Sequence, residues 1–372
     1  MAKRRGNNEG SIYRRKDGYW VGQYGVNTAA GRKTRYIYGK RREEVREKLT
    51  KAVAARDGGF IFDGESMSVR EYLTRWLNDS VRGSVRASTH ASYEGQVRRY
   101  IIPACGRIKL GKLTSAHVQY LYREMQDRGL SARTVQYTHA VLHRALKQAR
   151  RWGMVDRNVA EDVDPPQLKR EEIQPLDPEQ TRRLLQAAKG DRLHALYVVA
   201  VTAGLRPGEM LGLRWSDVDL AAGTLRINRA LSGGEFAATK TPRSRRKIEL
   251  SNTARAALKS HRKRQLEEQM HRAGLWKDYG LVFPSSVGTP LSHRNVVRSF
   301  KALLKRAGLP ASTRLYDLRH TCATLLLNSN VHPKYVQELL GHASIAQTLD
   351  TYSHVLKGMD GGIGGAMDAA LG

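Results

Sequence analysis

Thr202-Ala203-Gly204-Leu205-Arg206-Pro207-Gly208-Glu209 is the segment on which the interpretation of this 372-residue sequence turns. Proline is favoured at the first position of a helix, so Arg206 is expected directly before a helix N-terminus. A phosphate bound there would meet the guanidinium, free backbone N–H groups and the positive end of the helix dipole. Glu209, three residues further on, is expected to brace the arginine. The segment therefore predicts a phosphate-binding site.

Four segments further along the chain carry residue types that could cleave a phosphodiester without a metal. They are Lys240 in a loop between strands, Tyr316-Asp317-Leu318-Arg319-His320-Thr321, Leu339-Leu340-Gly341-His342 and Thr351-Tyr352-Ser353-His354-Val355. Arginine forks hold the non-bridging oxygens, lysine can protonate the leaving oxygen, and a tyrosine among cations can attack phosphorus. With 16 tyrosines and 12 histidines in the chain, each segment alone is weak evidence, and the argument depends on their combination and order.

Composition favours a nucleic-acid partner. The chain has 64 Lys and Arg against 35 Asp and Glu, a net charge of +29, and such an excess calls for a polyanion. Two cysteines, Cys105 and Cys322, exclude a disulfide scaffold and a four-cysteine zinc site. The sequence has no phosphate-loop, His-Glu-x-x-His or Cys-x-x-Cys motif and no apolar run long enough to span a membrane. It predicts a protein of a reducing, intracellular compartment with no cofactor and no metal.

Residues 1–62 are predicted to form a DNA-binding domain of three strands and one helix. Residues 1–60 hold 16 basic and 6 acidic residues, and strand-like runs occur at 11–14, 19–24 and 34–38. Basic side chains interleave there with tyrosines, a composition suited to a DNA groove, although such a sheet can also be merely solvated. The candidate DNA contacts are Arg14, Arg15, Lys33 and Arg35.

Residues 63–164 are predicted to form a four-helix domain. Ser68 and Glu71 match a capping box, apolar residues from Val69 to Leu77 follow helical spacing, and Pro103 is expected to end a second helix that begins near Ser88. The basic residues on the outward faces of these helices either are merely solvated or contact DNA phosphates. Because acidic partners are scarce, phosphate contact is favoured. The candidates are Arg86, Arg98, Arg133 and Lys147. A proline-rich linker, 165–177, leads to a mixed α+β domain at 178–372.

The sequence resembles the tyrosine recombinases of the phage-integrase family over nearly its whole length. Ala203 to Glu209 match the first arginine box, Leu318 to Thr321 the second, and Leu339 to His342 followed by Thr351-Tyr352 the C-terminal signature. The helical region is similar to the family's core-site-binding domain, and the N-terminal sheet to the arm-binding domain of larger integrases. The resemblance implies a multidomain, mainly α protein whose catalytic domain has the mixed α+β fold of these enzymes.

The resemblance also implies roles for individual residues. Tyr352 is the nucleophile that forms a 3′-phosphotyrosine. Arg206 and Arg319 hold the phosphate oxygens, and His342 donates a hydrogen bond to the phosphate. Lys240 protonates the leaving 5′-oxygen, with Lys247 as a nearby competitor for that role. No metal or ATP is needed, because the phosphotyrosine retains the energy of the cleaved bond.

One position departs from the family pattern. Tyr316 stands where the family usually has a histidine, three residues before Arg319. A phenol can donate a hydrogen bond but is a poor base at neutral pH, so the role of Tyr316 is open. His320 is not an obvious substitute, since the family's usual residue there is also histidine.

The resemblance implies integration and excision of a mobile element, such as a viral genome, by a homotetramer on core-type and arm-type sites in double-stranded DNA. A DNA-bending host factor and an excisionase are further expected partners, and the expected location is a bacterial cytoplasm, in association with the nucleoid. Two other functions stay open: a non-catalytic architectural protein, and a topoisomerase that relaxes DNA through the same phosphotyrosine.

Overall fold

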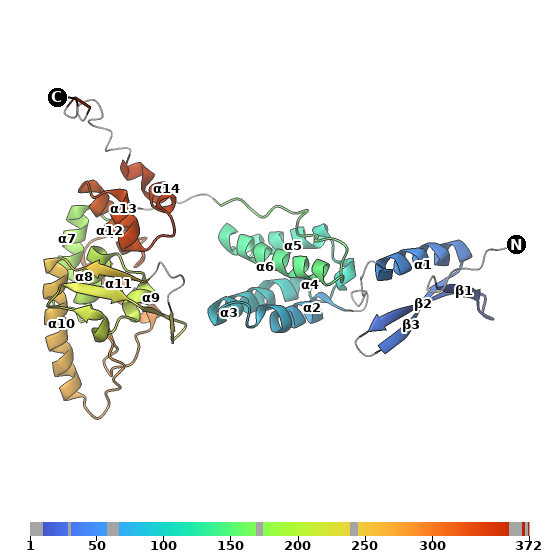
Figure 1. Cartoon of the computed structure of the whole chain (residues 1–372), viewed down its shortest axis with the longest axis horizontal. Helices are drawn as coiled ribbons and strands as arrows, with labels where there is room; N and C mark the ends of the chain where they lie inside the picture. The colour runs from blue at the N-terminus through green and yellow to red at the C-terminus, as the bar shows by residue number, and fades with distance from the viewer. Residues whose placement is uncertain are drawn as a thin grey trace. The chain divides into compact units, whose positions relative to one another are not determined.

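The structure is a computed structural model that describes residues 10–28, 31–57, 67–168, 174–238, 245–356, 367–368 and 371. The chain divides into two compact units, Met1–Arg170 and Glu171–Gly372. Helices predominate in the described parts, and a small three-stranded sheet lies near the N-terminus (Figure 1). The predicted fold class is confirmed, whereas the division of the chain into an arm-type, a core-binding and a catalytic domain stays a prediction.

The N-terminal sheet is an antiparallel meander covered by one helix (Figure 1). Its elements are β1 (Ser11–Arg14), β2 (Trp20–Thr28), β3 (Gly31–Gly39) and α1 (Arg42–Asp57). The helix packs on the face to which Gly22 belongs, because a Cβ there would lie 3.0 Å from Val45 Cγ1. All three predicted strands and the helix are confirmed.

The helical part of the first unit packs around a single apolar core. Its α-helices are α2 (Val69–Trp76), α3 (Ala87–Gln96), α4 (Ile102–Cys105), α5 (Ser115–Asp127) and α6 (Ala132–Arg151); wider or tighter turns are η1 (Leu77–Val81), η2 (Val97–Ile101) and η3 (Leu110–Lys112). The predicted capping box forms, with the Ser68 hydroxyl accepting from the Glu71 N–H and the Glu71 carboxylate accepting from the Ser68 N–H. Tyr72 and Trp76 are fully buried, as the helical spacing predicts.

The prediction that Pro103 ends the second helix is wrong. The helical path continues through η2 and α4 to Cys105. The five residues of η2 form a π-helical turn, in which the Ile102 N–H donates to the Val97 carbonyl. This change of register places Pro103 in the first turn of the next α-helical segment, where a missing N–H is tolerated.

The second unit surrounds a small sheet with helices (Figure 1). The helices are α7 (Pro178–Ala187), α8 (His194–Ala203), α9 (Pro207–Leu211), α10 (Asn252–His271), α11 (His293–Arg306), α12 (Asp317–Asn328), α13 (Pro333–Leu340) and α14 (Ile345–Leu356), with a short 3₁₀ turn η4 (Trp215–Asp217). The antiparallel sheet has the order β4 (Val218–Asp219), β5 (Thr224–Ile227), β8 (Arg246–Glu249), and β6 (Arg229–Ser232) pairs with β7 (Glu235–Ala238). Strands β5 and β8 are therefore paired neighbours.

The apolar run Leu281-Val282-Phe283 makes only an isolated bridge to Arg214. Side chains of α10 hydrogen-bond its backbone carbonyls. The ring of His261 is hydrogen-bonded to the Val282 carbonyl at 2.7 Å, and the Gln265 side-chain amide donates to the Leu281 carbonyl at 2.9 Å. Because these groups are already partnered, the run needs no strand beside it.

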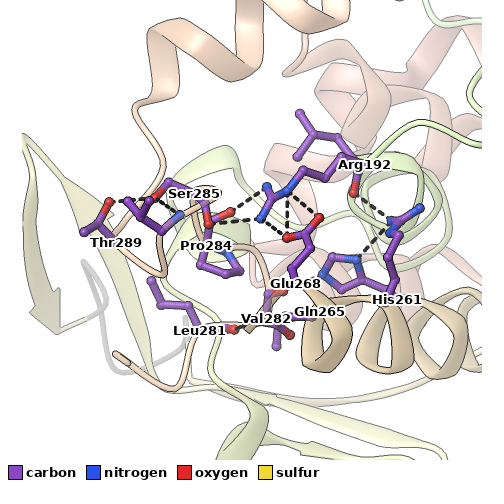
Figure 2. A network of polar contacts seen from close by, with 12 residues as sticks. Arg192, His261, Gln265, Glu268, Leu281, Val282, Pro284, Ser285 and Thr289 are labelled. Carbon is purple, nitrogen blue, oxygen red and sulfur yellow. Dashed lines mark hydrogen bonds and ion pairs between the residues drawn. The ribbon is translucent and has the colours of Figure 1, made fainter. Parts of the chain in front are cut away.

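A partly buried polar network, shown in Figure 2, fixes this segment to the body of the unit. The Arg192 guanidinium forms two-pronged contacts with the Glu268 carboxylate at 2.9–3.0 Å and donates to the carbonyls of Pro284 and Ser285. A two-pronged contact of this kind fixes direction as well as distance. The network lies among α8, α10 and the segment after α10, and involves none of the predicted catalytic residues.

Candidate active site

Arg319 lies in the first turn of α12 with only 1% of its surface exposed. Its guanidinium donates to the carbonyl of Gly204 at 2.7 Å and to that of Leu340 at 2.5 Å. Gly204 has a left-handed backbone (φ 59°), and a Cβ on it would lie 2.9 Å from Leu340 Cδ2. A larger residue at 204 would therefore be strained and would push apart the two segments that hold the arginine.

The C-terminal end of α13 gathers three arginines. Consecutive carbonyls accept from them: Leu339 from Arg246 Nε at 2.5 Å, Leu340 from Arg319, and Gly341 from Arg206 Nη2 at 3.3 Å. The last carbonyls of a helix lack partners within it and carry its partial negative charge, so they suit cationic donors. Gly341, at φ 63°, ends the helix and leads directly into His342.

Glu209 joins two of these arginines. Its carboxylate accepts from Arg206 Nη1 at 2.8 Å and from Arg246 Nη2 at 3.0 Å, and its side chain is 4% exposed. The expected bracing of Arg206 by Glu209 is thus present. Arg206 directly precedes α9, as predicted. Because α9 is only five residues long, we attribute the positive charge at this position to the guanidinium.

Glu209→Gln is expected to destabilise the second unit. Burial raises the pKa of Glu209, but Arg246 and Arg206 outweigh burial and hold it below the ordinary value. The charge therefore stabilises the fold above the unfolded-state pKa, and this contribution is lost as pH falls through the lower folded-state pKa. Losing a buried ionic partner costs about 3–5 kcal/mol.

Urea denaturation of the full chain at pH 7 and pH 4 measures this effect. Glu338→Gln is the matched control, because Glu338 pairs with Lys334 on the exposed surface. At pH 7 the Glu209 variant should lose far more stability than the control, and at pH 4 its deficit relative to the parent should shrink. Equal losses for the two variants at pH 7 would contradict the bracing role.

His342 is buried next to these arginines. Its Nδ1 lies 2.8 Å from the Thr348 hydroxyl. Burial, then the positive charges of Arg319 and Arg206, lower its pKa to about 4. At neutral pH the ring is therefore uncharged and keeps one N–H, which can donate a hydrogen bond to a phosphate oxygen.

Tyr352 lies on α14 at a kink, with φ −118° inside the helix, and its side chain is 1% exposed. Its hydroxyl lies 2.8 Å from His320 Nδ1. Burial raises the pKa of the phenol, although the positive charge of Arg319 opposes the rise. On its other side the His320 ring meets the edge of the Tyr316 ring, and the centroids of these two rings are 5.3 Å apart.

Of the predicted catalytic residues, Arg206, Arg319 and His342 come together around the end of α13, and Tyr352 lies within reach of the charge of Arg319. Lys240 lies outside the described residues, between β7 and β8. Its competitor Lys247 is exposed on β8. Within the described ranges no three His, Cys, Asp or Glu residues form a group that could hold a metal ion.

Sequence reasoning missed Arg246 as part of the site. A signal existed, because Arg246 and Ile248 alternate along β8, Leu250 follows the strand at the same spacing, and both Ile248 and Leu250 are buried. Alternation places Arg246 on their face of the strand, directed to the interior, and a buried arginine needs a partner. That pattern would have indicated an internal ion pair.

The strand positions of the proposed N-terminal DNA contacts do not share a face of the sheet with its exposed tyrosines. Tyr13, Tyr36 and Tyr38 are exposed on the face opposite α1, as strand pairing and alternation require. Positions 14 and 35 alternate onto the other face. Arg15 is in the turn and forms an ion pair with Asp17, and Lys33 lies in β3.

The proposed contacts of the helical part are exposed. Arg86 precedes α3, Arg98 lies in η2, and Arg133 and Lys147 lie on α6 away from its buried face. A fifth cation, Arg144, lies 5.5 Å from the ring centroid of Tyr93 and donates to its hydroxyl. No helix in the parts of the chain that the structure describes is long and apolar enough to cross a membrane.

Family models match parts of both units. The model of the phage integrase family matches residues 174–359, and that of the N-terminal SAM-like domain of phage integrases matches residues 68–126. An integrase of Streptomyces ambofaciens is 30% identical, covering 95% of this chain and 94% of its own. Among solved structures, the Tn1549 transposon integrase in complex with transposon right-end DNA aligns with a TM-score of 0.67 at 22% identity, over 77% of this chain and 95% of that one. A lambda integrase tetramer bound to a Holliday junction aligns at 0.60 and 19% identity, over 90% and 96%.

Proposed function

The chain belongs to the phage integrase family and is a site-specific recombinase that cleaves and rejoins DNA, and we propose that Tyr352 performs the cleavage. Its phenolic oxygen attacks the scissile phosphorus in line with the 5′-oxygen. The bond from phosphorus to the 5′-oxygen breaks, and the 3′ end of the strand stays joined to the tyrosine. The 5′-hydroxyl of a partner strand then attacks the phosphotyrosine and releases Tyr352.

In this proposal, Arg206 and Arg319 hold the two non-bridging oxygens of the phosphate. Both are anchored before DNA arrives: Arg206 donates to the Glu209 carboxylate and the Gly341 carbonyl, and Arg319 donates to the carbonyls of Gly204 and Leu340. Anchored donors need little reorganisation as negative charge develops. Each such donor contributes about 3–4 kcal/mol in the transition state of comparable reactions.

His342 and Lys240 complete the proposed site. The neutral ring of His342 donates to the phosphate, and its neighbour Thr348 orients the imidazole. Lys240, in the segment between β7 and β8, protonates the 5′-oxygen as it leaves. The phosphotyrosine ester conserves the energy of the cleaved bond, so rejoining requires no ATP.

One observation carries the proposal: the end of α13 brings Arg206 and Arg319 to adjacent carbonyls, with His342 directly after them. Three motifs that are far apart in the sequence are thereby brought into one cationic group, which supports a phosphate-binding role. The pairing of Arg319 with its buried carbonyls explains how a guanidinium persists in the interior.

The test is a nicked attachment-site duplex from which a short strand diffuses after cleavage. Without that strand the reverse reaction is blocked, and we expect a covalent complex that survives denaturing electrophoresis and is removed by protease. DNA binding without an adduct would favour the architectural alternative. Relaxation of supercoiled plasmid without recombinant products would favour a topoisomerase.

We further propose that the protein acts as a tetramer on double-stranded DNA, with residues 63–164 binding core-type sites and residues 1–62 binding arm-type sites. The exposed cations of α3, η2 and α6 support the first contact. The exposed tyrosines of the N-terminal sheet, together with its basic composition, support the second. Integration of a mobile element into a bacterial chromosome and its excision, assisted by a DNA-bending host factor and, for excision, an excisionase, are the functions this arrangement serves.

Deleting residues 1–60 is expected to remove arm-site binding and leave core-site binding intact. The deletion removes sixteen basic residues. Each phosphate contact that is lost makes the fall of log affinity with log salt concentration less steep by about 0.9. Footprinting and a salt titration on separate arm and core duplexes measure the two effects. An unchanged arm footprint would contradict the assignment.

A further inference from the structure

The hydroxyl of Tyr352 has one hydrogen-bond partner in the described structure, and it is His320 rather than an arginine. The distance from the hydroxyl to His320 Nδ1 is 2.8 Å, and the two ring centroids are 5.8 Å apart. A buried phenol is protonated at neutral pH, so attack on phosphorus requires a group that takes its proton. The proposed clamp residues cannot do this, because guanidinium groups have no acceptor atom.

We propose that His320 is a catalytic residue of this recombinase: its Nδ1 holds the hydroxyl of Tyr352 and accepts the phenolic proton as the oxygen attacks phosphorus. This inference rests on the proposed role of Tyr352 as nucleophile. As the bond from Tyr352 Oη to phosphorus forms, the proton moves to His320. The bond to the 5′-oxygen breaks, and that oxygen receives a separate proton from the acid. In rejoining, His320 returns its proton to Tyr352.

The ring of His320 is neutral and therefore carries a lone pair that can accept a proton, although its lowered pKa makes it a weak base until a phosphate is bound. Burial lowers its pKa to about 4, with the charge of Arg319 adding to the effect. The imidazole is therefore neutral before DNA binds, and the tautomer with hydrogen on Nε2 leaves the lone pair of Nδ1 directed at the hydroxyl. A bound phosphate adds negative charge nearby, which favours the protonated ring at the moment of transfer.

Tyr316, at the position where the family usually has a histidine, contacts the ring of His320 in this chain. Positions 316 and 320 are four residues apart at the start of α12 and share one side of it. The edge of the Tyr316 ring meets the His320 ring at 65°. Tyr316 thus positions the imidazole from one side, while Tyr352 contacts it on another.

Cleavage of the nicked duplex by His320→Asn tests the inference. Asparagine can keep a hydrogen-bonding atom near the position of Nδ1 but cannot take up a proton. We expect single-turnover formation of the adduct to slow by about 100-fold or more, the usual contribution of a general base. DNA affinity and thermal midpoint should stay near those of the parent. His271→Asn, on the exposed end of α10, is the matched control and should cleave at the parental rate.

A modified leaving group separates the two proton transfers. With sulfur in place of the bridging 5′-oxygen, the leaving thiolate needs no proton, so a Lys240→Ala defect should largely disappear. The His320→Asn defect should persist. Its disappearance on this substrate would overturn the inference, because His320 would then serve the leaving group. A parental rate for His320→Asn on the normal substrate would overturn it as well.

A second variant makes the test independent of any folding defect at position 320. Adding Tyr316→His to His320→Asn supplies an imidazole one helical turn away, and we expect it to restore cleavage by about tenfold or more. Failure to restore, combined with loss of DNA binding by His320→Asn, would assign His320 a purely structural role. If the parent forms no adduct at all, the proposed function fails and not this inference alone.

Discussion

Tyr352→Phe is expected to bind attachment-site DNA like the parent and to form no covalent adduct. The phenyl ring still fills its place in the cluster with Leu327, Val336 and Leu340. The lost hydrogen bond to His320 costs about 1 kcal/mol of stability, so the fold should survive. Cleavage should be lost, because phenylalanine puts no oxygen at the position of the Tyr352 hydroxyl. Denaturing electrophoresis of the nicked duplex with each protein measures the adduct.

Tyr335→Phe is the matched control, because Tyr335 is 67% exposed on α13 and contacts no member of the site described above. It should form the adduct at the parental rate. An adduct with Tyr352→Phe at parental yield would assign the nucleophile to another residue, and peptide mapping of the labelled protein would then locate it.

The sequence predicted the pairing of Arg206 and Glu209 because that geometry is local. Pro207 sets the start of a helix, and Glu209, three positions after the N-cap residue Arg206, faces back to the helix N-terminus. The buried helix faces of the first unit were predictable for a similar reason, since a period of 3.6 residues determines which side chains share a face. Both depend on neighbours within one turn of the chain.

The grouping of arginines at α13 could not be predicted in this way. Backbone carbonyls have no signature in the sequence, so nothing marks Leu339, Leu340 and Gly341 as acceptors for three arginines from other segments. The contact between His320 and Tyr352 likewise depends on how α12 and α14 pack across 32 positions of sequence. Motif order identified the participants, whereas tertiary packing decided their partners.

Pro103 illustrates the opposite error, in which a local rule is overridden. A proline inside an α-helix removes one hydrogen bond and clashes with the preceding turn. The π turn of η2 shifts the hydrogen-bond register just before it, so the helical path continues. The rule was sound for a regular helix, but the sequence gives little indication that this helix is irregular.

Arg319→Lys is expected to lower adduct formation by about 100- to 1,000-fold, the loss seen when one transition-state donor is removed. Lysine keeps the charge but not the planar fork, so it cannot serve the carbonyls of Gly204 and Leu340 and a phosphate together. One buried carbonyl is left unpaired, which costs about 1–3 kcal/mol. Arg319→Lys should therefore lose stability as well as activity.

Arg206→Lys provides the comparison that separates these two effects. The side chain of Arg206 is 30% exposed, so its replacement should reduce cleavage with a smaller loss of stability. Rates on a duplex with a methylphosphonate at the scissile position complete the test, because methyl replaces one charged non-bridging oxygen. If Arg319 acts by neutralising charge, Arg319→Ala, which removes the positive charge, should lag the parent less on this duplex than on the natural one. An equal deficit on both substrates would show that Arg319 serves the fold of the pocket and not the developing charge.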